Sequence, residues 1–240
     1  MKLLRNNRRE LIQKKGVLKY LAYAFGEILL VVFGILIAVY LNNWNEDKKD
    51  AKELQNILLI VQKDIKNDIR EANEVVLFEK GKEKLYDRFF KGELTAKDYI
   101  ESRRFRRLIF GFKEISFDKR GFKLLNNYKN NVEISKDSLI SNIIELYTDR
   151  LEEVNADDKL RNLDFELNYN YWKNQAWWSD YIREVKSDTF IEYALHSQDY
   201  KNRVASWHFI TFKAFIPELE EFIEDAEKIN KLIESREIRK

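Results

Sequence analysis

The 41 Asp and Glu residues of this 240-residue sequence could take part in metal binding or catalysis, but none stands in a spacing that is diagnostic of either. Cysteine is absent, which excludes disulfides, thiolate catalysis, Cys-ligated zinc and iron–sulfur clusters. The two histidines, His196 and His208, are twelve residues apart and do not form an HExxH motif. The signatures GxGxxG, GxxxxGKS/T and GxSxG are also missing from the sequence. We therefore expect a protein that is not an enzyme and that holds no cofactor and no metal.

Glu27 is the residue whose position most suggests chemistry, because it is the one carboxylate within the apolar run of residues 20–41. A carboxylate at the centre of a bilayer costs about 2.5 kcal/mol or more, so such residues are functional candidates. Glu27 could pair with another helix, contact a cationic residue of a partner, or carry a proton. The alternative is an interfacial acid close to the lipid headgroups.

The apolar run has the length and the flanks of a single transmembrane helix. Its 22 residues reach about 33 Å as a helix, against a hydrocarbon core of about 30 Å. Tyr20 and Tyr23 lie at one end and Tyr40 and Trp44 at the other, as in aromatic belts. The run exceeds the apolar region of a cleaved signal peptide and has no small-residue cleavage site after it. We predict an uncleaved signal anchor over residues 20–41.

The charge on either side of the run predicts its orientation. Residues 1–19 carry seven Lys and Arg side chains and one Glu, a net charge of +6, whereas residues 42–60 carry three Lys. The positive-inside rule places the basic tail, residues 1–19, in the cytoplasm. Residues 42–240 then form an extracytoplasmic domain, where nucleic acid is not an expected partner.

Small residues recur at every fourth position of the span except at Leu30, which completes the period. Such a stripe lets two helix backbones approach closely, and it predicts a homo-oligomer through the transmembrane helix. The alternative is the ordinary glycine and alanine content of membrane helices. The candidate contact residues are Ala22, Gly26, Gly34 and Ala38.

The segment Tyr23–Ala38 and the motif Asn42-Asn-Trp-Asn-Glu46 resemble the signature of an uncharacterised family of bacterial single-span membrane proteins. A weaker likeness continues at Gly121–Leu125 and from Ile134 to Tyr147. The resemblance implies a basic N-terminus, one span and a helical region of about this size, located at the bacterial inner membrane. It implies no activity, because the family has none that is known.

Composition and periodicity predict an all-α protein, with the N-terminal transmembrane helix followed by an antiparallel helical bundle. Glycine occurs seven times and proline once, too rarely for the many turns of a β-sandwich. Apolar residues between Leu54 and Val76 advance with a mean step close to 3.6. Further helices are expected at residues 96–109, at 118–128, from about 136 onward, and at 212–233. Thr95 is expected to cap the first of these, and Pro217 to restart or kink the last.

Two groups of residues in the domain are candidates for contact with a partner. The basic cluster could bind phosphate or anionic lipid, although four arginines on a short helix also occur as a solvated face. The tryptophans follow an expected turn at residues 174–176 and could be exposed, although packing between helix ends is the alternative. These residues are Arg103, Arg104, Arg106 and Arg107, and Trp177 and Trp178.

Three functions fit these features. The first is an interaction or scaffold protein of the bacterial envelope, anchored in the lipid bilayer, that binds another protein or itself. The second is a regulatory or energy-coupling subunit that uses Glu27 within a membrane complex. The third is a helical sensor of a small ligand, which a ligand-sized polar pocket in the bundle would favour.

Overall fold

The structure, a computed structural model, describes residues 17–128 and 137–238, and it divides the chain into two compact units. The first unit ends at Asn56 and the second begins at Ile57. Residues 1–16 of the basic tail lie outside the described residues, as does the part of the family likeness at residues 134–136. No β-strand occurs in the described ranges, so the predicted all-α class is confirmed.

Helix α2 runs from Val17 to Lys80 without interruption. No proline and no glycine occurs between Gly34 and Gly81, and the helix ends directly before Gly81. Among the described residues, α2 alone is long and apolar enough to cross a membrane, and nothing in the chain buries its apolar window. The membrane-length helix expected at residues 20–41 is therefore present as part of a longer helix.

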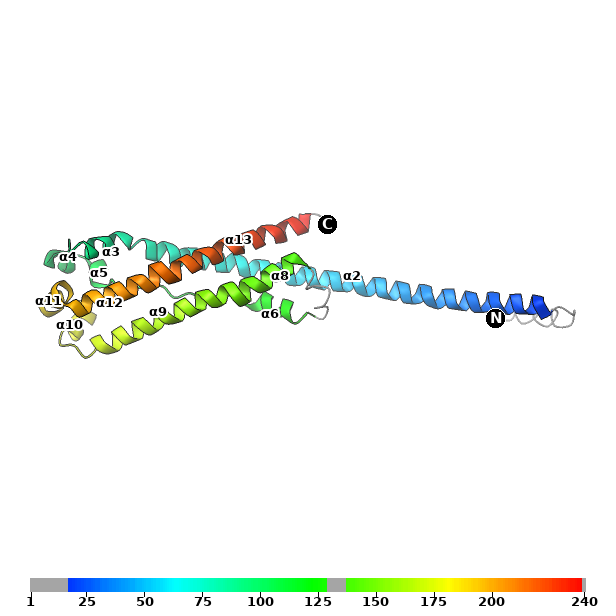
Figure 1. The fold of residues 1–240 in the computed structure, drawn as a ribbon, viewed down its shortest axis with the longest axis horizontal. Helices are drawn as coiled ribbons and strands as arrows, with labels where there is room; N and C mark the ends of the chain where they lie inside the picture. The colour runs from blue at the N-terminus through cyan, green and yellow to red at the C-terminus, as the bar shows by residue number, and fades with distance from the viewer. Residues whose placement is uncertain (1–16, 129–136, 239–240) are drawn as a thin grey trace. The chain divides into compact units, whose positions relative to one another are not determined.

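The second unit is built on three long helical segments that lie side by side (Figure 1). The first is the part of α2 that follows Asn56. The other two each contain a π-helical turn and are longer than the sequence predicted. They consist of α8 (Ser138–Glu145), η1 (Leu146–Arg150) and α9 (Leu151–Trp172), and of α12 (Gln198–Phe209), η2 (Ile210–Phe215) and α13 (Ile216–Ile238).

The C-terminal segment is antiparallel to α2, as the sequence predicted for the bundle. Lys66 of α2 pairs with Glu234 at 3.0 Å, and Lys80 pairs with Glu220 at 2.6 Å. Residue numbers on α13 therefore fall as those on α2 rise.

The segment from α8 to α9 runs parallel to α2, which the antiparallel prediction missed. The Tyr147 hydroxyl donates to Asp68 at 2.9 Å, and Arg161 lies 3.8 Å from Glu79, so both numbers rise together. This order is possible because residues 111–119 return along the bundle in an extended conformation. Helix α6 (Arg120–Asn126) follows this extended segment and is shorter than the predicted 118–128.

The extended segment has no neighbouring β-strand among the described residues, and buried carboxylates of α2 accept hydrogen bonds from its backbone instead. The Asp118 N–H donates to Asp68 at 2.7 Å, and the Gly121 N–H donates to Asp64 at 2.6 Å. Buried backbone groups must find partners, and here side chains supply them. A Cβ at position 121 would lie 2.5 Å from the Val61 nitrogen, so only glycine lets α6 approach α2 this closely.

Pro217 lies directly after the π turn η2 and does not interrupt the helix. Proline lacks an N–H, and its ring crowds the carbonyl four residues earlier. The preceding Ile216 N–H donates to Thr211 five residues back, so the helix is widened where the proline enters. The sequence predicted a restart or a kink here, and the structure shows a continuous helix with a π turn.

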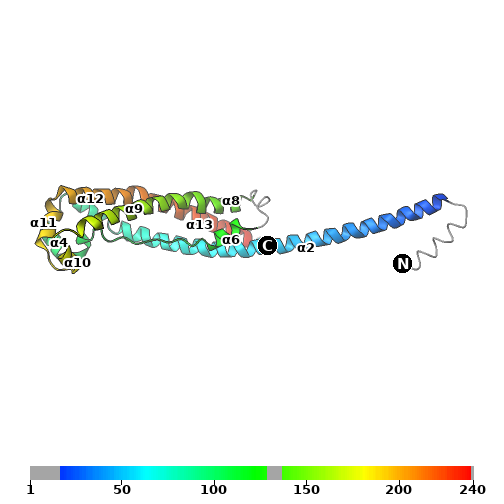
Figure 2. The ribbon, with the colours of Figure 1, turned by 90° about the horizontal axis from the view of Figure 1, so that it is seen from below.

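Short helices close the end of the bundle at which α2 terminates, and they gather there in both ribbon views (Figures 1 and 2). Between them lies a core dominated by aromatic rings, including Tyr86, Trp172 and Trp207. These helices are α3 (Glu83–Phe90), α4 (Ala96–Glu101), α5 (Arg103–Arg106), α10 (Trp178–Ile182) and α11 (Asp188–His196).

The single helix predicted over residues 96–109 is wrong, because the chain breaks at Ser102 into α4 and α5. Thr95 does cap α4, with Asp98 completing a capping box. Tyr99 and Phe105 are both buried in the aromatic core. On one straight helix they would point about 120° apart, and the extended residue Ser102 turns both side chains inward.

Candidate functional site

The residues predicted to act in the span all lie on α2 and are not covered by the rest of the described chain. Glu27 is partly exposed. A Cβ added at Gly26 or Gly34 would meet no atom within 4 Å, so a second helix could approach at either place. The structure leaves the contact itself a prediction.

Helix geometry limits which of the small residues can act together. Residues four apart on an α-helix differ by about 40° in direction, so Ala22 and Ala38 lie about 160° apart. The four predicted contact residues therefore do not form one face. Gly26 and Gly34, about 80° apart on either side of Leu30, are the pair that one crossing helix can reach.

The arginine cluster is partly neutralised. Arg103 and Arg107 both pair with the Glu184 carboxylate, in the second case at 3.1 Å. Glu184 has a φ of 58°, a left-handed conformation that is uncommon for residues other than glycine. Arg104 and Arg106 extend from the same short helix, α5, toward the surface. Half of the predicted anion site is thus engaged within the chain.

Trp177 lies in the aromatic core, so of the two alternatives left open the packing between helix ends applies to it, and it is not an exposed contact for a partner. Its ring centroid lies 5.0 Å from that of Phe190 and 5.5 Å from that of Tyr193. The turn expected at residues 174–176 is present. It directs Trp177 inward, because α10 folds back over the end of α9. Trp178 is partly buried beside Tyr181 and remains the accessible one of the two.

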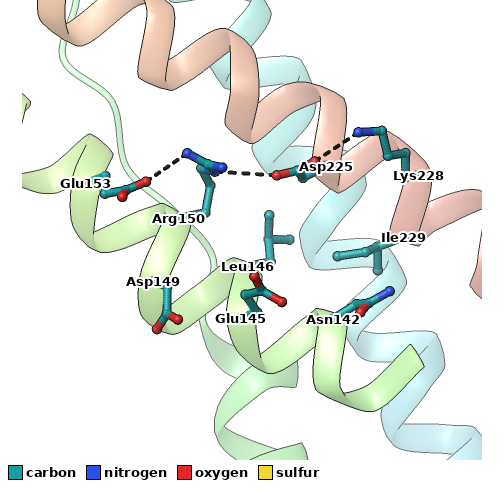
Figure 3. A pocket seen from close by; sticks show the side chains of 9 residues that line it. All are labelled: Asn142, Glu145, Leu146, Asp149, Arg150, Glu153, Asp225, Lys228 and Ile229. Atoms are coloured by element: carbon teal, nitrogen blue, oxygen red, sulfur yellow. Dashed lines mark hydrogen bonds and ion pairs between the residues drawn. The ribbon is translucent and has the colours of Figure 1, made fainter. Parts of the chain in front are cut away.

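A groove in the second unit lies between α13 and the helix that contains η1 (Figure 3). Its volume is about 460 Å³, and polar or charged side chains make up most of its walls. Only Leu146 and Ile229 are apolar. The polar lining residues are Asn142, Glu145, Asp149, Arg150, Glu153, Asp225 and Lys228.

Arg150 organises the acids along one side of this groove. Its guanidinium lies 2.8 Å from Glu153, 2.9 Å from Glu221, 3.3 Å from Glu218 and 3.4 Å from Asp225. Burial and the neighbouring carboxylates raise the pKa of Glu218. One cation thus joins η1 and α9 to α13 (Figure 3). Glu145 at the end of α8 and Asp149 of η1 also line the groove.

A second charged cluster lies between α2 and α9, and its Glu79 and Arg161 side chains are fully buried. Glu79 accepts from Lys82 at 2.8 Å, and Arg161 donates to Asp158 at 2.6 Å. The Arg161 guanidinium also lies 3.9 Å from the ring centroid of Phe215 and donates to a carbonyl of the extended segment. Burial lowers the pKa of both Lys82 and Arg161. This cluster fixes the two parallel helices and the extended segment in register.

Asp68 occupies a third charged position and is almost completely buried. Burial raises its pKa from 3.8 to about 7, against the opposing effect of its hydrogen bonds from the Asp118 N–H and from Tyr147. The carboxylate therefore changes its protonation near neutral pH. Asp68 therefore combines a pKa near neutral pH with a hydrogen bond to the backbone of the extended segment.

Helix α9 places its polar and apolar residues in an unusual way. Arg161 and Asn168 are buried, whereas Leu160, Leu163 and Leu167 are exposed by 46%, 51% and 59%. Asn168 accepts from Arg203 of α12 at 2.8 Å, which explains its burial. No described residue covers the leucines.

Sequence analysis missed the buried charges and the exposed leucines. Both involve residues whose usual location is the opposite, and periodicity alone gives no sign of the exchange. The isolated Asp64, Asp68 and Glu79 within the apolar period of α2 are the only signal that was available.

Residues 27–109 match a family of unknown function (DUF6090). The predicted resemblance to an uncharacterised family is confirmed over this range, which extends from Glu27 to the residues after α5. The weaker likeness predicted after Gly121 lies outside it. No curated protein and no solved structure matches the chain.

Proposed function

We propose that this protein is a single-pass membrane protein of the bacterial inner membrane whose helical domain binds a partner protein. In this proposal residues 20–41 span the bilayer, the N-terminus is cytoplasmic, and the domain is extracytoplasmic. The domain acts as an interaction or scaffold unit and carries out no reaction of its own.

One observation carries the proposal: the apolar window of α2 is long enough to cross a bilayer, and none of the described residues buries it. Large apolar side chains on soluble proteins are packed or scattered, and a contiguous set needs a partner or a membrane. The excess of Lys and Arg before the span supports the orientation.

The interaction role is supported by the outward leucines of α9. The groove near Arg150 has the size and the polar lining that a small-ligand sensor predicts, so the sensor is the second candidate. It is less well supported, because the lining cations Arg150 and Lys228 already pair with carboxylates of the chain. A role for Glu27 in a larger complex remains a prediction, and no contact of the described chain favours it.

Reporter fusions test the proposal in the membrane. An alkaline phosphatase fused after Lys240, which is active only outside the cytoplasm, is expected to be active, and a fluorescent reporter that folds only in the cytoplasm is expected to be dark. The matched control replaces the Lys and Arg residues of positions 1–19 by Gln and is expected to reduce the asymmetry of the two signals. A cytoplasmic signal from the natural chain would contradict the topology, and extraction of the chain by carbonate would contradict the span.

A further inference from the structure

The exposed leucines of α9 follow the spacing of a helix–helix seam. Leu160, Leu163 and Leu167 are three and four residues apart, as are residues at the contact between two packed helices. Phe209 is 63% exposed and lies three residues after Ser206, which donates to Asp164 of α9. Residues three or four apart on a helix share a face, so Phe209 lies on the side of α12 that carries Ser206 and meets α9. We call these four residues the leucine face.

Toward the N-terminus of α9 the same spacing leads from apolar to acidic side chains. Steps of four and three from Leu160 reach Ala156 and Glu153, and Glu153 lines the groove of Figure 3. Residues 145–159 contain six carboxylates against Arg150 and Lys159, and the adjacent residues 218–228 contain six carboxylates against Lys228, which pairs with Glu224 and Asp225. The leucine face therefore borders a surface with an excess of carboxylates, the acidic end.

We propose that the leucine face and the acidic end together form one docking site for a basic amphipathic helix of a partner protein. The inference rests on the proposed interaction function and names its surface and the chemistry of the partner. Leucine-like side chains of the partner would cover the leucine face, and its Lys or Arg residues would lie along the acidic end.

Charge favours this occupant over the others. Two copies anchored in the same membrane would meet through this surface with their α9 helices parallel. Their acidic ends would then lie side by side, which like-charge repulsion opposes. Anionic lipid headgroups are repelled for the same reason. A basic helix gains from both parts of the site, since burial of its apolar side supplies affinity and the carboxylates supply orientation and a faster encounter.

Peptide binding to the full-length chain tests the site. The chain is placed in nanodiscs of phosphatidylcholine, which has no net charge, and fluorescence anisotropy follows a labelled helical peptide with leucines at three–four spacing and lysines toward one end. A matched peptide carries Glu in place of each Lys. We expect the Lys peptide to bind, with an affinity that falls as salt rises, and the Glu peptide to bind at least tenfold more weakly.

Variants locate the peptide on the chain. The triple variant Leu160→Ser, Leu163→Ser and Leu167→Ser is expected to weaken binding at least tenfold. The matched control changes three exposed leucines elsewhere, Leu59→Ser, Leu77→Ser and Leu124→Ser, and is expected to change binding less than twofold. Neutralising the acidic end by Glu152→Gln, Glu153→Gln and Asp157→Asn is expected to weaken binding at least fivefold and to flatten its salt dependence.

Several results would overturn the site. Equal binding by the natural chain and the α9 triple variant would show that the peptide does not bind the leucine face. Equal binding of the Lys and Glu peptides would show that charge complementarity plays no part. Self-association of the full-length chain that the same triple variant abolishes would assign the face to a second copy. Leu163→Lys, a single change, replaces the triple variant if the triple variant melts early. Carbonate extraction of cell membranes that contain each variant measures membrane anchoring separately. Loss of peptide binding with anchoring retained would therefore contradict the docking site alone and not the proposed membrane-anchored domain.

Discussion

The two parts of helix α2 contrast in what they expose. Residues 20–41 are apolar apart from Glu27 and are uncovered, whereas in residues 57–80 the carboxylates Asp64, Asp68 and Glu79 are buried. Secondary structure is the same in both. Carboxylates of the second part accept hydrogen bonds from an extended segment that has no neighbouring strand in the described chain. In the proposed span, the first part would meet only lipid, which offers no hydrogen bonds. The contrast teaches that the covering material decides which side chains of a helix are buried.

Separating the two parts is expected to have the largest effect. A chain of residues 47–240 should move entirely from the membrane to the soluble fraction and keep its helical fold, because the second compact unit contains the packed core. Cell fractionation and circular dichroism with thermal melting check this. A truncated chain without a cooperative melt would show that the parts depend on each other.

Removing a buried carboxylate from the second part is expected to cost most of the stability of the domain. Glu79→Leu leaves Lys82 and Arg161 without their shared acid, and breaking a buried pair in this way costs about 3–5 kcal/mol. Glu71→Leu on the exposed side of the same helix is the matched control, and it should stay within about 0.5 kcal/mol. Urea unfolding of residues 47–240 gives both values, and equal effects would contradict the structural role of Glu79.

The raised pKa of Asp68 predicts a pH dependence of the second part. Between about pH 4 and about pH 7 the folded chain keeps this proton and the unfolded chain releases it, so stability falls by up to about 1.4 kcal/mol per pH unit as pH rises. Asp68→Asn mimics the protonated acid, since its amide can accept from the Asp118 N–H and donate to Tyr147. We expect the variant to match the natural domain at pH 4 and to exceed its stability at pH 8.

The residues that face Asp68 provide the control for this experiment. Asp64, Asp118 and Tyr147 are its charged or titratable neighbours. Tyr147→Phe removes one hydrogen bond to the carboxylate and should move the loss of stability to higher pH, because that bond favours the charged form. Urea unfolding at five pH values between 4 and 8 checks the three chains, and identical slopes for all of them would rule out Asp68 as the titrating group.

The smallest effects are expected in the first part. Gly34→Leu should separate paired spans, because the added side chain keeps the backbones apart where close packing supplies the attraction. Glu27→Gln keeps shape and hydrogen bonding and removes only the charge, and pairing should survive it. Crosslinking in membranes checks both variants, and pairing that survives both would reduce the small residues to ordinary membrane-helix composition. Intact pairing with a lost cellular phenotype in Glu27→Gln would favour a titrating or ion-pairing role.

Much of the fold could be predicted from local patterns. Leu58, Val61, Ile65, Ala72 and Val76 are buried with the expected period, whereas Ile69 is only partly buried. The capping by Thr95 and the turn before Trp177 are also present. The break at Ser102 could not be predicted, because it depends on where the aromatic core lies relative to Tyr99 and Phe105. The inward position of Trp177 depends in the same way on α11 and on the end of α9.

By itself the sequence determined the all-α class, the membrane-length helix and the absence of cysteine chemistry, because each follows from composition or from a run of adjacent residues. Only the tertiary structure decided that α2 and α9 run parallel, that Arg161 is buried while Leu163 is exposed, and that four carboxylates surround Arg150. These features arise from residues distant in the chain, which the extended segment and the two π turns bring into register. A local sequence pattern indicates which faces of a helix could be buried, and the neighbouring helices decide which face is buried in the folded protein.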